Sequence, residues 1–307
     1  MSDGIDLRIR YERAFLVRKL ALAAAATSVL FSGVLCTGAA SAADMGAPAP
    51  AYTKAPAPVA AQIYDWTGFY VGGNFGGGWQ DASFASTSTS CFVLNCGDGL
   101  GHVGNDPAIQ LAGTGSDTRA GFAGGGQIGF NWQVNALVLG AEADIEAISG
   151  KLSIGGGPFP LASNLASTFT LTTTADATWV ATVRGRVGFA ADKWLLYATG
   201  GAAFTNLKLA QSYTDNCCSS TPLTTFTAST TKTGYAVGGG VEYAISRIWS
   251  LRAEYLFAGG FGSLSGSYLA TANSGNSDFH TVSAKLNIQQ ARVGLNYLFG
   301  GPVVAKY

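Results

Sequence analysis

The sequence predicts an all-β protein, an eight-stranded antiparallel up-and-down transmembrane β-barrel with short periplasmic turns and long extracellular loops. Three observations support this prediction. Eight segments alternate apolar and polar residues with a period of two, short and long connections alternate between them, and tryptophans stand near the segment ends. Only 12% of the 307 residues are charged and the formal net charge is zero. No basic surface is available to neutralise phosphates, so we expect no nucleic-acid partner.

The first 42 residues have the pattern of a secretory signal peptide. The basic residues Arg13, Arg18 and Lys19 precede an apolar run from Leu20 to Leu35, and small residues follow it. We expect cleavage after Ala42 and export of the remaining chain.

Two further segments follow the signal peptide. Residues 43–64 are rich in Ala and Pro without an apolar period, which predicts an extended periplasmic spacer. At Asp65 the composition changes to glycine-rich alternation, so residues 65–307 form the predicted barrel.

The first four candidate strands lie around residues 66–79, 122–132, 136–147 and 179–189. Each places apolar side chains on one face and small, polar or charged ones on the other, as a strand with two different environments requires. The apolar sets, in chain order, are Phe69, Val71 and Phe75; Phe122, Ile128, Phe130 and Trp132; Leu137, Leu139 and Ile145; Val183, Val187 and Phe189.

The next four candidate strands repeat this pattern around residues 194–204, 237–245, 249–257 and 292–299. Their apolar sets are Trp194, Leu196 and Phe204; Val237, Val241, Tyr243 and Ile245; Trp249, Leu251, Tyr255 and Phe257; Val293, Leu295, Tyr297 and Phe299. We find no persuasive helical period, which gives eight strands in all.

The connections between the candidate strands alternate in length. Tight turns are expected near Asn135, Asp192 and Arg247. The other connections are long, polar and rich in Ser, Thr and Gly, over residues 80–118, 150–177, 210–231 and 259–279. Short turns on one side and long loops on the other are typical of an outer-membrane barrel, and an even strand count places both ends of the barrel in the periplasm.

The six tryptophans indicate which face meets the membrane. All are expected at strand ends, as in the aromatic girdles of two membrane interfaces: Trp66, Trp79, Trp132, Trp179, Trp194 and Trp249. The apolar face is therefore predicted to meet lipid and the polar face the lumen. The alternative is a soluble β-sandwich or lipocalin-like barrel that buries the apolar face, with tryptophans in mid-strand.

The predicted lumen carries charges of both signs: Glu142, Asp144, Glu146, Glu242 and Glu254 against Arg184, Arg186, Arg252 and Arg292. They lie on the third, fourth, sixth, seventh and closing strands, so opposite signs are expected to meet across the interior. An unpaired buried charge is costly, whereas hydrogen-bonded ion pairs satisfy one another. We therefore predict a charge network that plugs the barrel.

The stretches "YDWTGFYVGGNFGGGW" and "RVGLNYLFGGPVVAKY" resemble the small outer-membrane β-barrel family of Gram-negative bacteria. Its members are described as outer-membrane immunogenic or porin-family proteins and are related to the OmpA-type transmembrane barrel. The resemblance covers the chain from about Asp65 to Tyr307. It implies an outer-membrane location, with membrane lipid, lipopolysaccharide and the barrel assembly machinery as partners, and it names no surface partner.

The closing strand also resembles the signal that the assembly machinery reads. Gly294, Tyr297 and Phe299 match that pattern, which the resemblance assigns to insertion rather than to any ligand. The family usually ends at an aromatic residue. Here the chain continues past Phe299 and ends at Tyr307, so either residue fits the role of terminal aromatic.

The segment from Gly124 to Gly129, "GGGQIG", matches the dinucleotide-binding fingerprint in letters alone. That fingerprint requires a helix after the glycines, and here a strand is expected instead. The histidines, His102 and His280, lie in or beside the long connections and are expected to be solvated rather than catalytic. No cofactor or metal is predicted, because the His and Cys spacings fit no ligand pattern.

Four cysteines remain after export, and Cys91 with Cys96 is the first disulfide candidate. Cys217 and Cys218 are adjacent, which disfavours a bond between them.

Three functions from different classes fit the sequence. The resemblance implies a non-enzymatic envelope protein with a structural and surface-display role. The alternative is a diffusion channel for small solutes, which a filled lumen of about eight strands would oppose. A surface enzyme would need a cluster of catalytic groups at the loop-facing rim, and the sequence offers none that we recognise.

Overall fold

The computed structural model describes residues 64–92, 95–96, 106–161, 165–216, 221–272 and 277–299. The predicted signal peptide and all but the last residue of the predicted spacer lie outside these ranges, as do His102, Cys217, Cys218 and Tyr307. Within them, no helix is long and apolar enough to cross a membrane.

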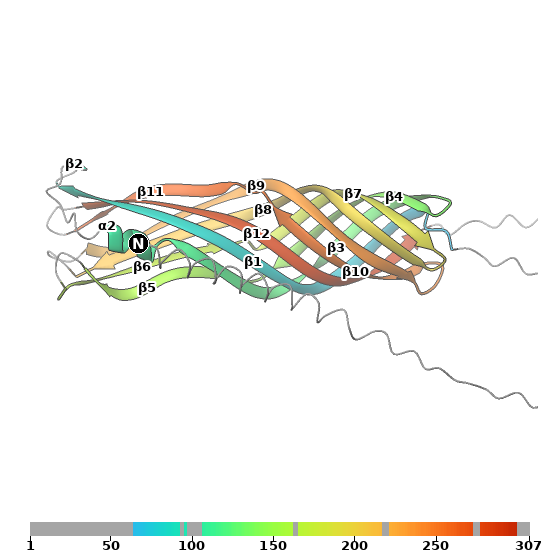
Figure 1. Cartoon of the computed structure of the whole chain (residues 1–307), viewed down its shortest axis with the longest axis horizontal. Helices are drawn as coiled ribbons and strands as arrows, with labels where there is room; N and C mark the ends of the chain where they lie inside the picture. Colours follow the sequence, from blue (N-terminus) through green and yellow to red (C-terminus); the bar gives the residue numbers. More distant parts are fainter. Residues whose placement is uncertain are drawn as a thin grey trace, which may run out of the picture. The chain divides into compact units, whose positions relative to one another are not determined.

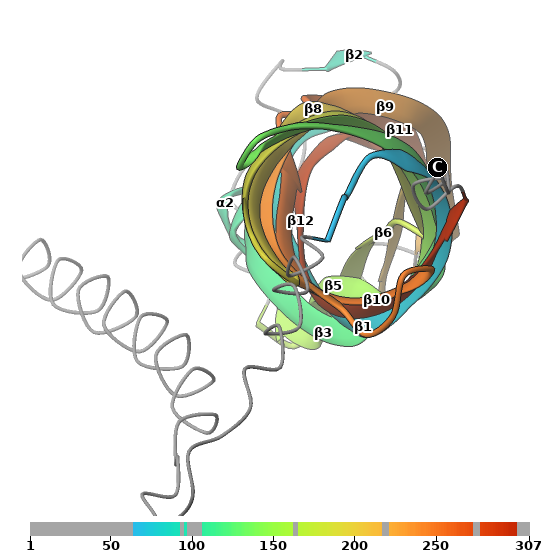
Figure 2. The same ribbon diagram turned by 90° about the vertical axis from the view of Figure 1, so that its right-hand side faces the viewer.

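Eight antiparallel strands form a closed ring, as the alternation predicted (Figure 2). Each pairs with the next, and β12 pairs back with β1 from Phe299 opposite Phe69 to Ser277 opposite Cys91. The ring strands are β1 (Gly68–Phe92), β3 (Gly115–Val134), β4 (Leu137–Ile148), β7 (Trp179–Ala191), β8 (Trp194–Asp215), β9 (Thr221–Ala244), β10 (Trp249–Gly259) and β12 (Ser277–Phe299).

The predicted tight turns lie together at one end of the ring, called here the turn end. Asn135 follows β3 with a φ of 55°, and Asp192 follows β7 with a φ of 52°. Asn and Asp tolerate this left-handed conformation, which two-residue hairpin turns require. The third turn joins β9 to β10, where the main-chain N–H of Ile245 donates to the carbonyl of Trp249.

The opposite end is called here the extended end. We expected long polar loops there, but much of this region is strand (Figure 1). The strands β1, β8, β9 and β12 run on into these connections and reach 25, 22, 24 and 23 residues. Four further strands and one unexpected helix fill much of the rest: β2 (Asn95–Cys96), β5 (Leu152–Pro160), β6 (Thr168–Asp176), β11 (Ser263–Thr271) and α2 (Asp106–Ala112). The Ser/Thr-rich stretches that were expected to be loops form strands instead. Thr favours the extended backbone of a strand, and alternate residues in these stretches are apolar.

The strand pattern reverses its phase between the two ends. Near the turn end of β12, Val293 and Leu295 point outward while Arg292 is buried. Towards the extended end, Leu286 is buried and Lys285 is exposed. The β1–β12 ladder runs through this point without a register shift. The outer surface is therefore apolar at the turn end and polar at the extended end, as expected for a barrel that rises from a membrane into water.

The interior changes in the same way. At the turn end a small apolar cluster contains Trp66, Val138 and Leu195. A larger cluster, called here the extended-end core, packs alanines, leucines and Phe84 between the strands beyond the phase reversal. A third cluster joins Ile109 of α2 to Phe169 and Tyr213. The charged residues described below lie between the first two clusters.

The extended end consists of two four-stranded groups rather than a continuous ring. One group is β11–β12–β1–β3, and the other is β9–β8–β6–β5. The second group arises because β6 takes the place of β7 beside β8, from Asp176 opposite Lys208 to Phe169 opposite Asp215. The two groups enclose the extended-end core between them.

Candidate functional site

All nine charged side chains predicted for the lumen lie inside the ring. None is more than 6% exposed, and they come from β4, β7, β9, β10 and β12: Glu142, Asp144, Glu146, Arg184, Arg186, Glu242, Arg252, Glu254 and Arg292. They share one face because successive residues of a strand alternate between its two sides. The strand register also places opposite charges side by side, with Glu142 opposite Arg184 and Glu254 opposite Arg292.

Arg184 ties three strands together. Its Nη2 donates to Glu142 Oε1 at 2.6 Å and to Asp144 Oδ2 at 2.5 Å, both on the neighbouring β4. Its Nη1 reaches across the lumen to Glu254 Oε1 on β10 at 3.0 Å. One guanidinium therefore bridges opposite walls of the ring, with charge-assisted bonds that are stronger than neutral ones.

Arg292 makes the complementary bridge from β12. Its Nη2 donates to Glu254 Oε1 at 2.5 Å and to Asp144 Oδ2 at 3.3 Å. Its Nη1 donates to Glu146 on β4. Glu254 thus accepts from Arg184 and Arg292 together, which joins the two bridges into one network.

Arg252 and Arg186 extend the network to the remaining strands. Arg252 donates to Glu142 on β4, and to Gln127 Oε1 on β3 at 2.6 Å. Arg186 donates to Glu242 Oε2 on β9 at 3.0 Å. The Arg186 guanidinium carbon also lies 4.0 Å from the centroid of the Tyr197 ring, in cation–π geometry.

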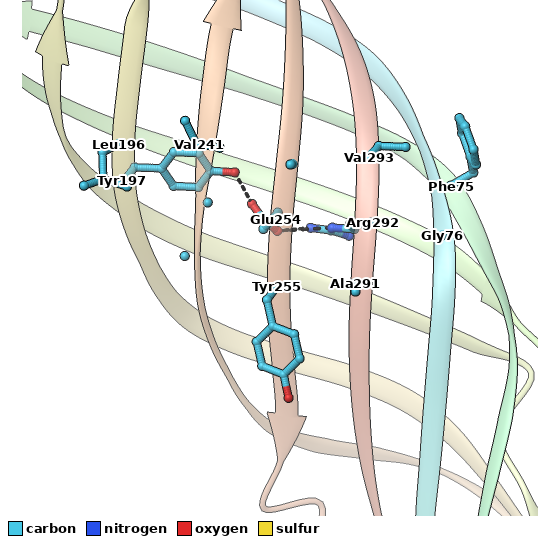
Figure 3. A pocket seen from close by; sticks show the side chains of 13 residues that line it. Phe75, Gly76, Leu196, Tyr197, Val241, Glu254, Tyr255, Ala291, Arg292 and Val293 are labelled. Carbon is cyan, nitrogen blue, oxygen red and sulfur yellow. Dashed lines mark hydrogen bonds and ion pairs between the residues drawn. The ribbon is translucent and has the colours of Figure 1, made fainter. Parts of the chain in front are cut away.

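Neutral residues that the sequence analysis did not single out complete the network. Tyr70 donates to Glu142 at 2.5 Å, and Tyr197 donates to Glu254 at 2.6 Å. Figure 3 shows Tyr197 and Arg292 converging on Glu254 from the two sides. Both tyrosines occupy inward-facing positions of their strands. The alternation of side chains in the sequence could therefore have identified them as lumen residues. Further amide and hydroxyl partners are Gln127, Ser250, Gln290 and Asn296.

The arrangement fills the lumen with fixed charge. Each of the nine groups has at least one ion-pair partner of opposite sign. Every ring strand contributes a member, because β1, β3 and β8 supply Tyr70, Gln127 and Tyr197. Such a desolvated network is strongly disturbed when one partner is removed. Among the described residues, no group of His, Cys, Asp and Glu has an arrangement that could hold a metal ion.

Four of the six predicted girdle tryptophans project clearly outward. Trp132 and Trp194 are 57% and 54% exposed near the turn end, and Trp249 is 39% exposed. Trp79 is 38% exposed but lies within β1 rather than at its end, because that strand continues to Phe92. Trp179 begins β7 and is half-buried.

Trp66 contradicts the girdle prediction. It is 1% exposed and packs inside the turn end with Val138 and Leu195. Its main-chain N–H donates to Gln133 Oε1 at 2.8 Å. The reason is that β1 begins at Gly68, so the alternation does not extend back to Trp66, and the chain before the strand folds into the mouth of the ring.

The predicted assembly signal lies on the closing strand next to β1. Gly294 faces inward, where a Cβ atom would lie 3.1 Å from the carbonyl oxygen of Gly73. Tyr297 and Phe299 face outward with ring centroids 4.9 Å apart, and Phe299 is opposite Phe69. Their role in insertion stays a prediction.

The structure also places the glycine-rich motif and the cysteine pair that the sequence analysis considered. Gly124 to Gly129 lies in the middle of β3 and is followed by more strand. Cys91 and Cys96 are directly opposite each other in the β1–β2 pair, so the backbone register is compatible with the predicted disulfide.

His280 contradicts the expectation of a solvated side chain. It is 0% exposed on the inward face of β12, between the rings of Tyr213 of β8 at 4.6 Å and Tyr268 of β11 at 5.0 Å. Among the residues that the structure describes, neither ring nitrogen has a hydrogen-bond partner. It lies inside the extended end because β12 continues far beyond the charge network, which a loop assignment did not anticipate.

This burial predicts an acid-sensitive extended end. Burial lowers the pKa of the His280 imidazole from its usual value of 6.5 to about 4, against the opposing effect of Asp215. The folded state favours the neutral imidazole. The free energy of unfolding of the extended end should therefore be unaffected by His280 above pH 6.5 and should fall by about 3 kcal/mol as the pH drops from 6.5 to about 4. Hydrogen exchange of β12, corrected for intrinsic rates, should show this loss. The variant His280→Phe should lose most of this pH dependence, and an unchanged profile would contradict the assignment.

A closed ring of eight antiparallel strands, with an apolar outer belt near the turn end and a buried charged interior, defines an integral membrane β-barrel. Residues 32–299 match the family model of the outer membrane protein β-barrel domain, and the chain belongs to this family. It is a protein of the bacterial outer membrane.

Named relatives agree with this family. The chain is 33% identical over 249 residues to the 31 kDa outer-membrane immunogenic protein of Brucella melitensis biotype 1, which covers 79% of this chain and 88% of that protein. It is 28% identical over 158 residues to the 22 kDa outer membrane protein of Rhizobium leguminosarum bv. viciae, which covers 51% of this chain and 61% of that protein.

Solved structures with similarity to the chain include two bacterial proteins. Neisserial surface protein A has 13% identity and a TM-score of 0.28, with 76% of this chain and 98% of that chain covered. The outer membrane protease OmpT from Escherichia coli has 10% identity and a TM-score of 0.37, with 78% and 99% covered.

Proposed function

We propose that this protein is a non-enzymatic, non-conducting barrel that supports the outer membrane and displays its extended end at the cell surface. The observation that carries the proposal is the charge network, in which Arg184 and Arg292 bridge opposite walls of the lumen through Glu254. Beyond this network the extended-end core continues the filling with apolar side chains.

The filled interior favours this proposal over a diffusion channel. An eight-stranded ring has room for little more than its own side chains. Here those side chains form ion pairs, and a packed apolar layer follows them along the lumen. A solute could pass only by breaking the ion pairs and displacing the apolar side chains. The same ion pairs oppose an enzymatic role for the lumen, because each carboxylate is bound to an arginine rather than free to exchange a proton.

The outer surface supports the proposed partners. Exposed apolar side chains such as Phe75, Phe122, Ile145 and Leu196 surround the ring between the turn end and the phase reversal, where membrane lipid and lipopolysaccharide acyl chains would cover them. The barrel assembly machinery would read the closing strand during insertion. The Brucella relative is named an immunogenic outer-membrane protein, which is in keeping with a displayed surface.

Surface proteolysis tests the proposed display. A specific protease site inserted after Asn216 should be cut on intact cells, because Asp215, the last residue of β8, and Thr221, the first residue of β9, lie at the extended end. The matched control carries the same site between Asp192 and Lys193, in a tight turn, and should be cut only after the outer membrane is opened. The reverse pattern would contradict the display.

A further inference from the structure

The chain enters β1 from inside the ring. Figure 2 looks onto the turn end and shows the blue segment ahead of β1 crossing the inside of the ring. Gly68, the first residue of β1, has a φ of 147°, a conformation that residues with a Cβ atom rarely adopt. This glycine lets the backbone leave the direction of the strand and turn into the mouth of the ring. Residues 64–67, called here the strap, therefore lie inside the turn end.

Apolar packing holds the strap in the mouth. Trp66 is 1% exposed, and Tyr64 lies beside it with ring centroids 4.8 Å apart in edge-on geometry. Trp66 shares an apolar cluster with inward side chains of four ring strands: Val138, Ala190, Leu195, Tyr197 and Ala244. Two aromatic rings thus fill the space between these strands at the level of the tight turns.

Hydrogen bonds to one residue of the wall latch the strap. The main-chain N–H of Trp66 donates to Gln133 Oε1 at 2.8 Å, and the main-chain N–H of Gln133 donates to Thr67 Oγ1 at 3.1 Å. Within the strap, the main-chain N–H of Thr67 donates to Asp65 Oδ1 at 2.9 Å. In the described part of the chain, no residue outside the strap other than Gln133 hydrogen-bonds to it, and the ladders of β1 begin only after it. The strap can therefore leave the mouth without breaking the ring.

The strap lies next to the charge network. Tyr197 belongs to the cluster around Trp66 and also donates to Glu254 at 2.6 Å. Burial raises the pKa of the Tyr64 hydroxyl to about 12, and the negative charge of Glu242 adds to this rise. The two aromatic residues of the strap therefore lie between the buried charges and the water at the turn end.

We propose that the strap is a movable closure of the turn-end mouth, hinged at Gly68 and latched by Gln133. In place, it keeps water at the turn end away from the ion pairs. Swung out, it leaves them open to solvent, which screens such pairs. This inference goes beyond the proposed function, because it assigns a separate closure to the chain ahead of the barrel, whichever end of the barrel faces outside.

A thiol beneath the strap reports whether the mouth is closed. Ser250 is 5% exposed on β10, opposite Ala244 of the Trp66 cluster, and its hydroxyl donates to Glu242. Ser250→Cys is introduced into full-length protein whose own cysteines are replaced by serine. In detergent micelles, the rate of its reaction with a charged, water-soluble methanethiosulfonate is measured. The thiol should react slowly with the strap intact and severalfold faster after Trp66→Ala.

Two further variants release the strap without removing its indole. Gln133→Ala removes the latch and should raise the rate less than Trp66→Ala does, because the aromatic packing remains. Gly68→Val should also raise the rate, since a β-branched residue is strained at a φ of 147°.

Matched controls change the same residue types outside the strap. Trp132→Ala removes an indole that is 57% exposed on the outer face of β3, next to Gln133 in the chain. Gly73→Ala adds a methyl group to an exposed glycine of β1, where the nearest atom is 3.7 Å away. Both controls should leave the rate unchanged.

Each variant is first shown to be folded by its heat-modifiable migration. The inference is overturned if Trp66→Ala and Trp132→Ala react at the same rate. A shared fast rate means that the mouth is open with the strap in place, and a shared slow rate means that the charge network alone excludes the reagent. If Trp66→Ala does not fold, the pairs Gly68→Val with Gly73→Ala and Gln133→Ala with Trp132→Ala decide in the same way.

Discussion

Replacing Arg184 and Arg186 together with alanine should destabilise the barrel by several kcal/mol. The change leaves Glu242 without its arginine at 3.0 Å, and removes the bridge between β4 and β10. Removing one partner of a buried ion pair leaves an uncompensated charge, which costs about 3–5 kcal/mol. Urea unfolding in micelles, followed by the loss of heat-modifiable migration on gels, measures the change.

An exposed ion pair provides the control for this variant. Arg119 lies 3.0 Å from Asp117 at the extended end, with its side chain 55% exposed. Arg119→Ala should change stability by less than about 1 kcal/mol, because solvent screens such pairs. If the double arginine variant were as stable as the Arg119 variant, the network would not hold the barrel together.

The second large effect concerns the phase reversal along β12. Leu286→Asp should unfold the extended end while leaving the membrane-embedded ring in place. Leu286 is 2% exposed and belongs to the extended-end core, whose described members are apolar side chains that cannot compensate a carboxylate. Burying an unpaired charge is costly enough to open the local structure.

The adjacent residue is the matched control. Lys285 is exposed on the outer side of the same strand, so Lys285→Asp should shift stability by less than about 1 kcal/mol. Amide exchange across Val282 to Ile288 distinguishes the two variants. Equal effects of both substitutions would contradict the assignment of Leu286 to the buried face and Lys285 to the exposed face of β12.

The alternation of side chains was enough to predict the ring. A strand with lipid on one side and charge on the other must alternate, so Val293 and Leu295 could be assigned to the outside and Arg292 to the inside. The same period placed Glu142 and Arg184 on the inner faces of adjacent strands, because sequential strands pair. Their direct opposition is a finding of the structure.

The extended strands were missed because their alternation changes phase. Ala284, Leu286 and Ile288 occupy even positions, whereas Val293 and Leu295 occupy odd ones, and the switch falls at Gln289 and Gln290. A search for one apolar phase therefore ends where the membrane ends. Reading both phases would have detected the outer parts of β1 and β12.

Other features depend on tertiary contacts that a strand pattern does not contain. The bridge from Arg184 to Glu254 crosses the lumen, and its partners are decided by the stagger of the whole ring. Trp66 lies outside any strand, so the period does not govern its side chain. The burial of His280 depends on Tyr213 and Tyr268 arriving from two other strands.

Single-channel recording in planar bilayers tests the central claim, that the charge network and the extended-end core close the lumen. Wild-type protein, first shown to be folded by its heat-modifiable migration, should pass almost no steady current. The Arg184→Ala, Arg186→Ala variant should show more frequent current steps where it still inserts. Large, steady conductance from the unmodified protein would contradict the closed lumen and favour a diffusion channel.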